Sequence, residues 1–226
     1  MALEQSVRLV LDKINNAKIR SPYNQNVELI AATKTRDILQ IQTCYELGIS
    51  SIGENRIQEA EKKLKELSSF SSIKKRFIGH LQTNKVNKCL RLFDTIDSVD
   101  TLKLAEKINS SSQPQKTECL IEINTSGESQ KKGFKAKLSK ELISCFSLEN
   151  LDIVGLMTIG PHTTSEKEIR GSFQLLRVFK DQINQELGEN KLTELSMGMS
   201  NDFELGIEEG STMVRVGTGI FGPRNY

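Results

Sequence analysis

The sequence is poor in the residues that hold most metal ions and disulfide frameworks. It contains no tryptophan, only four prolines and only two histidines among 226 residues. Its four cysteines are widely spaced and form no Cys-x-x-Cys pair, and they are Cys44, Cys89, Cys119 and Cys145. No histidine cluster lies near them that would complete a zinc site. We therefore predict reduced cysteines and no metal site.

The chain also lacks an excess of charge and a long apolar run. The 31 Lys and Arg residues and the 29 Asp and Glu residues leave a formal charge of +2. This balance argues against a general electrostatic affinity for nucleic acid or membranes, so any anion site must be local. No segment approaches about 18 apolar residues, and Met1 to Gln5 do not begin a signal peptide. We expect a cytoplasmic protein without a membrane span.

Strand-like and helix-like segments alternate along the whole sequence. Periodicity predicts strands at 27–34, 49–53, 76–81, 95–99, 118–124, 151–157, 194–199 and 212–216. It predicts helices at 3–17, 38–45, 57–67, 86–92, 102–108, 139–146, 169–187 and 201–208. The longest linker-like stretch, Ser110 to Pro114, is too short to separate domains, and the polar segment Ser126 to Lys137 is predicted to be a loop.

Eight such units predict one domain over residues 1–226. Alternating strands and helices form right-handed βαβ units with a parallel sheet. In roughly 200 residues, eight units favour a closed (β/α)8 TIM barrel, here preceded by an N-terminal helix. An open doubly wound sheet is the alternative, but the first strand is not followed by a Gly-x-Gly-x-x-Gly turn.

Lys34 closes the first apolar run, at the strand end where a barrel carries its functional groups. Because side chains alternate along a strand, Ile30, Ala32 and Lys34 are expected on one face. A lysine at a strand end usually only marks the return to solvent. In a barrel, however, binding and catalytic groups lie at the C-terminal ends of the strands. Lys34 is therefore a candidate amine for an aldehyde.

The ends of the last two strands are rich in small residues. They read Leu195 to Asp202 and Val214 to Gly222, and the loops at this place in a barrel often bind phosphate. Glycine lets backbone N–H groups approach an anion, and Ser and Thr add hydroxyl donors. Each segment alone is also compatible with an ordinary turn. Together with Lys34 they suggest pyridoxal 5'-phosphate (PLP), which carries both an aldehyde and a phosphate.

Several motifs resemble one known family. They are Ala32-Thr33-Lys34-Thr35, Ile52-Gly53-Glu54-Asn55, Phe77 to Lys85, Gly155-Leu156-Met157, Leu195 to Ser200 and Val214 to Gly222. The chain is similar to the YggS/PROSC family of pyridoxal-phosphate homeostasis proteins from Val27 to its C-terminus. That family resembles the barrel domain of alanine racemase, a fold type III PLP protein. The resemblance implies a barrel that binds PLP.

The resemblance also implies individual roles. Lys34 forms the Schiff base, Arg215 faces the pyridine nitrogen, and Asn55 and Met157 border the ring. The phosphate is held by Ser196, Gly217 and Thr218. No residue is assigned a catalytic role, and His80 at most lines the pocket. Arg36 and Thr83 depart from the commoner pattern of lysine and serine, which leaves Lys85 and Lys132 as candidates for a second lysine that passes on the cofactor.

Arg215 argues against efficient turnover. An arginine stays protonated, so it cannot supply a full pyridinium, and the cofactor is a weak electron sink. Racemisation needs a base on each face of the ring, and the barrel leaves no second domain to provide one. We predict a monomer that stores, buffers or delivers PLP, with PLP-dependent apo-enzymes as partners, and not an enzyme.

Two enzymatic alternatives remain open from the sequence. The first is a small PLP-dependent amino-acid racemase that uses His80 or Cys89 as its second base. The second is a phosphosugar-type barrel enzyme whose carboxylate base is Glu122 or Asp97.

Overall fold

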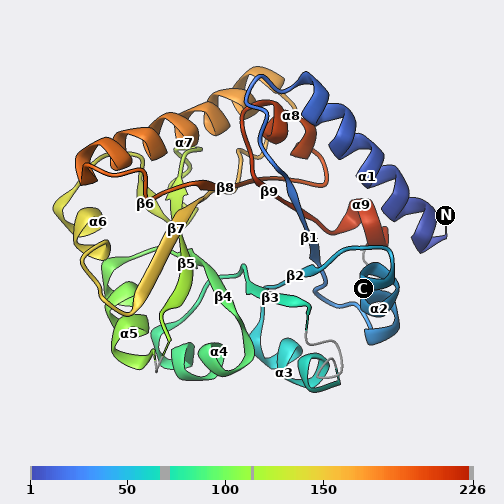
Figure 1. Cartoon of the computed structure of the whole chain (residues 1–226), viewed down its shortest axis with the longest axis horizontal. Coiled ribbons are helices and arrows are strands. Elements are labelled where there is room, and N and C mark those ends of the chain that lie inside the picture. Colours follow the sequence, from blue (N-terminus) through green and yellow to red (C-terminus); the bar gives the residue numbers. More distant parts are fainter. Residues whose placement is uncertain (1, 67–71, 113–114, 224–226) are drawn as a thin grey trace.

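Eight parallel strands close into a barrel within a shell of helices (Figure 1). The computed structural model describes residues 2–66, 72–112 and 115–223. The barrel strands are β1 (Glu28–Ala32), β2 (Ser51–Glu54), β3 (Lys74–Phe77), β4 (Thr95–Val99), β5 (Thr117–Asn124), β7 (Leu151–Met157), β8 (Glu194–Met199) and β9 (Met213–Val216). Their order is β4-β3-β2-β1-β9-β8-β7-β5, and pairing of β4 with β5 closes the ring. The predicted (β/α)8 barrel is confirmed.

The helices also follow the predicted pattern. They are α1 (Leu3–Arg20), α2 (Ile38–Glu46), α3 (Ile57–Glu66), α4 (Val86–Leu92), α5 (Leu102–Ser111), α6 (Lys140–Cys145), α7 (Glu166–Leu187), α8 (Phe203–Glu208) and α9 (Thr218–Phe221), with a 3₁₀ turn, η2 (Thr83–Lys85). Asp37 begins α2 as expected, because its carboxylate accepts from the Gln40 backbone N at 2.9 Å. Leu67, Gln113 and Pro114, which belong to predicted segments, lie outside the described residues.

The N-terminal helix covers the outside of the first and last strands. Its buried face, from Val7 to Ala17, packs against side chains of β1, β9 and α8. Ala31 of β1 and Val214 of β9 belong to this layer, whereas Ile30 points into the barrel. The alternation predicted for the first strand is therefore present as far as Ala32.

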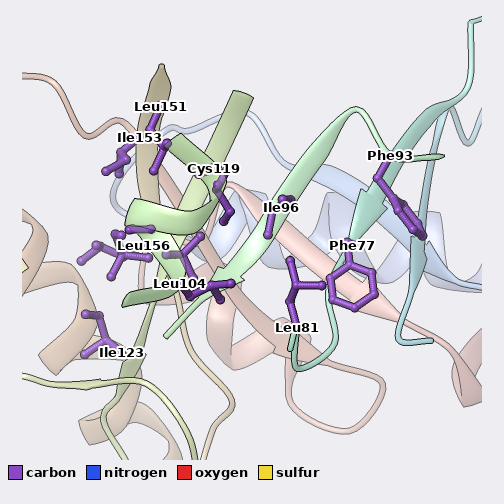
Figure 2. Close-up of a cluster of buried hydrophobic side chains, with 14 of the residues drawn as sticks. Phe77, Leu81, Phe93, Ile96, Leu104, Cys119, Ile123, Leu151, Ile153 and Leu156 are labelled. Atoms are coloured by element: carbon purple, nitrogen blue, oxygen red, sulfur yellow. The ribbon is translucent and has the colours of Figure 1, made fainter. Parts of the chain in front are cut away.

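Most of the apolar core lies between the strands and the remaining helices. Figure 2 shows part of this cluster, with Phe77, Ile96 and Cys119 of neighbouring strands beside Leu104 of α5. Phe77 and Phe93 pack edge to face with ring centroids 5.3 Å apart. All four cysteines are buried and free. No helix of the described residues has the length and apolarity that a membrane crossing requires.

The N-terminal end of the barrel interior is filled with charge. Arg76 is 1% exposed, and its guanidinium donates to Glu28 at 3.0 Å and to Asp97 at 3.3 Å. Lys74 and Glu118, paired at 2.8 Å, complete this Arg76 network. Asp97 is completely buried in it, and burial raises the pKa of this carboxyl. Asp97 therefore holds Arg76 and does not present a base at the barrel mouth, so its proposed role as a base in a phosphosugar enzyme was wrong.

Several predicted boundaries were wrong near the C-terminal ends of the strands. β1 ends at Ala32, and Lys34 lies in the turn that follows it. β3 spans Lys74–Phe77, so Gly79 lies beyond it, where an added Cβ would come within 2.3 Å of Asn55 O. Among the short elements, β6 (Phe134–Lys135), which pairs with β5 and lies within the segment Ser126 to Lys137 predicted to be a loop, and α9 were not predicted. Apolar periodicity continues past a strand end, so it marks an end only approximately.

Candidate functional site

Lys34 lies in a tight turn after β1 and is partly buried. Thr33 before it is fully buried, and its backbone N donates to Gly53 O at 3.0 Å. Thr35 after it has a φ of +62°, the left-handed region that a β-branched residue rarely adopts. The lysine is thus presented from a turn of fixed shape between β1 and α2.

Arg215 fills the centre of the barrel near its C-terminal end. It is 5% exposed, and its guanidinium donates to Ser196 O at 2.8 Å, Ser196 Oγ at 2.7 Å and Thr158 O at 2.7 Å. Burial lowers the pKa of this guanidinium, while the charges of Asp97, Glu122 and Asp202 act in the opposite direction. The three hydrogen bonds fix its orientation.

Ser196 lies next to Arg215 inside the barrel. The residue is fully buried, and its hydroxyl oxygen accepts the hydrogen bond from Arg215 Nη1. Its observed partner is thus the arginine, and direct contact of Ser196 with a phosphate remains a prediction.

Ser200, which the sequence analysis did not assign, lies where the last two strand ends meet. Its hydroxyl oxygen accepts from Gly217 N at 3.2 Å and from Gly219 N at 3.1 Å. Thr218 lies between these glycines and is exposed at the start of α9. Ser200 closes the Leu195 to Ser200 motif, but no signal in the sequence distinguishes its hydroxyl from that of Ser196. We call Ser200, Gly217, Thr218 and Gly219 the β8–β9 cradle.

The Lys34 turn and the cradle are neighbours because β1 pairs with β9 (Figure 1). An added Cβ at Gly217 would lie 3.4 Å from both Cβ and O of Ala32, which is two residues before Lys34. Glycine at position 217 therefore leaves the backbone open beside the end of β1.

The two residues predicted to border a ring lie on other strands. Met157 ends β7, is 1% exposed and shares the interior cluster with Ile30 and Leu120. Asn55 follows β2, where its backbone packs against Gly79. Met157 forms an apolar wall below the mouth, and Asn55 lies next to the β1 end because Ala32 pairs with Gly53.

A group of acids and a histidine occupies the β3 to β5 side of the mouth. His80 is partly exposed, and its Nδ1 lies 3.0 Å from Asp100 Oδ2. A hollow of 450 Å³ is lined by His80, Asp100 and Lys132 among others. The side chain of Glu122 is buried inside the barrel. Burial and the charge of Asp100 raise the pKa of this carboxyl to about 7, although the positive charges of Arg215 and Lys132 act to lower it.

Because the pKa of Glu122 is raised in the folded protein, we expect the free energy of unfolding to depend on pH. Between about pH 4.5 and 7 the unfolded chain loses this proton while the folded chain keeps it, so the native state is destabilised as the pH rises. The full difference is on the order of 3 kcal/mol. Glu122→Gln is expected to flatten this part of the curve, measured by urea unfolding at pH 5 and pH 8. Glu149→Gln, on the exposed surface, is the control, and parallel curves for wild type and Glu122→Gln would contradict the prediction.

Cys89 is not available as a second base. It lies on α4, fully buried in the outer core, and burial raises the pKa of its thiol. That part of the racemase alternative was wrong, because Cys89 lies in the helix layer outside the barrel and not at its mouth. Lys85 ends the 3₁₀ turn after β3 and is partly buried, whereas Lys132 is exposed in the loop after β5.

The family model and the curated proteins that match this chain point to the same family. The family model described as "Alanine racemase, N-terminal domain" matches residues 12–225. A pyridoxal phosphate homeostasis protein of Aquifex aeolicus is 38% identical over 221 residues, which are 96% of each chain. The human protein of the same name is 37% identical and covers 98% of this chain and 86% of its own.

Solved structures give the same result. PipY of Synechococcus elongatus, solved with PLP bound, superposes with a TM-score of 0.84 at 29% identity, covering 98% of this chain and all of its own. An alanine racemase of Clostridium difficile shares the fold alone, with a TM-score of 0.75 at 16% identity over 98% of this chain and 58% of the racemase.

Proposed function

Since this chain belongs to the family of pyridoxal phosphate homeostasis proteins, we propose that it binds PLP through Lys34 and stores, buffers or delivers it. The observation that carries the proposal is the contact between the strand end before Lys34 and the β8–β9 cradle. The turn that carries Lys34 and a group of anion donors follow two paired strands there, which suits a ligand with an aldehyde and a phosphate. We further propose that the protein acts in the cytoplasm as a monomer and serves PLP-dependent apo-enzymes.

The residues present fit this cofactor. The backbone N–H groups of Gly217 and Gly219 both point at one oxygen, the hydroxyl of Ser200, so a phosphate oxygen in place of that hydroxyl would accept from both groups. The side chain of Thr218 is exposed beside them. We propose that these residues hold the phosphate, with Ser196 contributing through its bond to Arg215.

The rest of the site would orient the ring. When bound, PLP supplies an aldehyde and an electron-withdrawing pyridine. Arg215 donates hydrogen bonds and has no acceptor, so it offers no proton that it would readily give up to a ring nitrogen. Met157 provides an apolar surface, and Asn55 a polar edge beside the end of β1. These residues bind and orient the cofactor, but they do not strengthen it as an electron sink.

The proposal of a carrier without efficient turnover is supported by the surroundings of the candidate bases. His80 is hydrogen-bonded to Asp100 beside the 450 Å³ hollow, and Cys89 lies in the outer core. Racemisation requires a base on each side of the reacting carbon, so a lone lysine is insufficient.

Two measurements test the proposed function. Titration of the purified protein with PLP is expected to produce a visible absorbance that saturates at one cofactor per chain. The loaded protein in deuterium oxide is expected to exchange the α-proton of added amino acids no faster than free PLP does. A protein that gains no absorbance does not bind the cofactor as proposed, and rapid exchange would identify an enzyme.

A further inference from the structure

A charged pair lies on the outer side of the barrel, directly behind the Lys34 turn. Glu54, the last residue of β2, is 1% exposed, and its Oε1 accepts hydrogen bonds from Lys63 Nζ and, at 2.7 Å, from Thr33 Oγ1. Lys63 comes from α3, and its Nζ also donates to Thr33 O at 2.7 Å. Both partners therefore bind the residue that precedes Lys34.

Thr33 is consequently held at each of its polar atoms. Its backbone N donates to Gly53 O, its hydroxyl donates to Glu54, and its carbonyl oxygen accepts from Lys63 and from Arg36 N. On the other side of Lys34, Thr35 has its left-handed conformation. Such a conformation costs of order 1–3 kcal/mol and persists only where the surroundings determine it. The hydrogen bonds of Thr33 help to hold Thr35 in this conformation, because they fix the position at which the turn begins.

The pair is not explained by stability alone. The side chains of Glu54 and Lys63 are only 1% and 14% exposed, and removing two charges from water is unfavourable. Glu54 Oε2 is one of two buried side-chain oxygens or nitrogens without a hydrogen-bond partner among residues 2–66, 72–112 and 115–223. An apolar pair would avoid both costs, but it would leave Thr33 O and Thr33 Oγ1 without these partners.

We infer that Glu54 and Lys63 are positioning residues that hold the Lys34 turn in the geometry in which its amine captures an aldehyde. Capture joins the amine nitrogen to the aldehyde carbon and releases the aldehyde oxygen as water. The inference rests on the proposed function, because it concerns the same lysine. Neither residue enters the barrel interior: Glu54 follows the inward-facing Gly53 on β2, and Lys63 extends from the helix layer. Their effect is on the turn and not on the β8–β9 cradle.

The test separates capture from phosphate binding. Lys63→Met and Glu54→Gln are each mixed with PLP, and the rate of appearance of the visible band is measured by stopped flow. Affinity for pyridoxine 5'-phosphate, which has the phosphate but no aldehyde, is measured by calorimetry. We expect capture to slow by about 10-fold or more, since misplacement of a reacting group by about 1 Å can cost about 100-fold. Affinity for pyridoxine 5'-phosphate is expected to stay within about 2-fold, because the hydrogen bonds of Glu54 and Lys63 go to Thr33 and to each other and not to a cradle residue.

Two further variants make the result specific. Lys62→Met, an exposed lysine on the same helix, is expected to behave as wild type. Lys63→Arg keeps a donor and a charge, and it is expected to recover most of the capture rate. Lys63→Met keeps the aliphatic stem, so it decides the question alone if Glu54→Gln does not fold.

The possible failures are distinct. Normal capture rates in both variants would overturn the positioning role, as would a parallel loss of capture, pyridoxine 5'-phosphate binding and thermal stability, which would indicate a general structural role. A wild-type protein that gains no visible band with PLP would instead refute the proposed function.

Discussion

Replacement of Lys34 by alanine is expected to abolish the visible absorbance that the protein gains with PLP. An alanine has no amine, so no covalent bond to the aldehyde can form at this position. The turn itself is expected to persist, because it is held by Thr33 and its partners Glu54, Lys63 and Gly53. Lys34→Ala is therefore expected to remain folded. Borohydride reduction of wild type followed by peptide mass analysis is expected to locate the cofactor on Lys34.

Other lysines at the barrel mouth provide the controls. Lys85→Ala and Lys132→Ala remove amines that follow β3 and β5, and both variants are expected to keep the absorbance band. If Lys34→Ala kept an unchanged band, or if the reduced cofactor were found on Lys132, the central assignment would fail.

The largest expected loss of stability is that of Arg76→Met. Methionine fills much of the volume of arginine but removes the cation from Asp97, which is completely buried, and from Glu28 and Glu118. Breaking a buried ion pair on one side typically costs about 3–5 kcal/mol, because the other charge is left uncompensated. Urea unfolding followed by circular dichroism is expected to show a loss of this size in the free energy of unfolding.

A double variant identifies the cause of that loss. Arg76→Met combined with Asp97→Asn removes both charges, so it should be more stable than Arg76→Met alone. Lys75→Met, which breaks the partly exposed pair with Asp94, is expected to cost below about 1 kcal/mol. Equal losses in the single and double variants would show that the packing of Arg76, and not its charge, matters.

The order of strands and helices could be predicted because apolar residues recur with a regular spacing in each barrel strand and each main helix. The ends of strands could not. Thr33 and Lys34 were read as the last residues of the first strand, yet β1 ends at Ala32 and Lys34 lies in the turn that follows. The Arg76 network could not be predicted either, because the sequence does not distinguish a charged residue that points into the barrel from one that faces solvent.

Some residues of the candidate site could likewise be predicted from the sequence, and others could not. Lys34, Arg215 and Gly217 could be selected because strand ends of a barrel meet at one mouth and because their motifs resemble a family. Ser200 could not be separated from Ser196, since both lie in one short segment and only the bend at Gly198, with φ at +96°, decides which hydroxyl reaches Gly217. The Glu54–Lys63 pair joins β2 to α3, and no local pattern in the sequence reports a contact between layers.

The pairing of β1 with β9 has a consequence for the newly made chain. Lys34 and Gly217 are roughly 180 residues apart, so the cradle is synthesised long after the lysine, and the pairing of β1 with β9 closes a longer loop than any other strand pair of the barrel. At about 5–20 residues per second, the lysine emerges from the ribosome roughly 10–40 s before the cradle residues that we propose hold the phosphate. The proposed preference for a phosphorylated aldehyde therefore requires that β9 has docked beside β1.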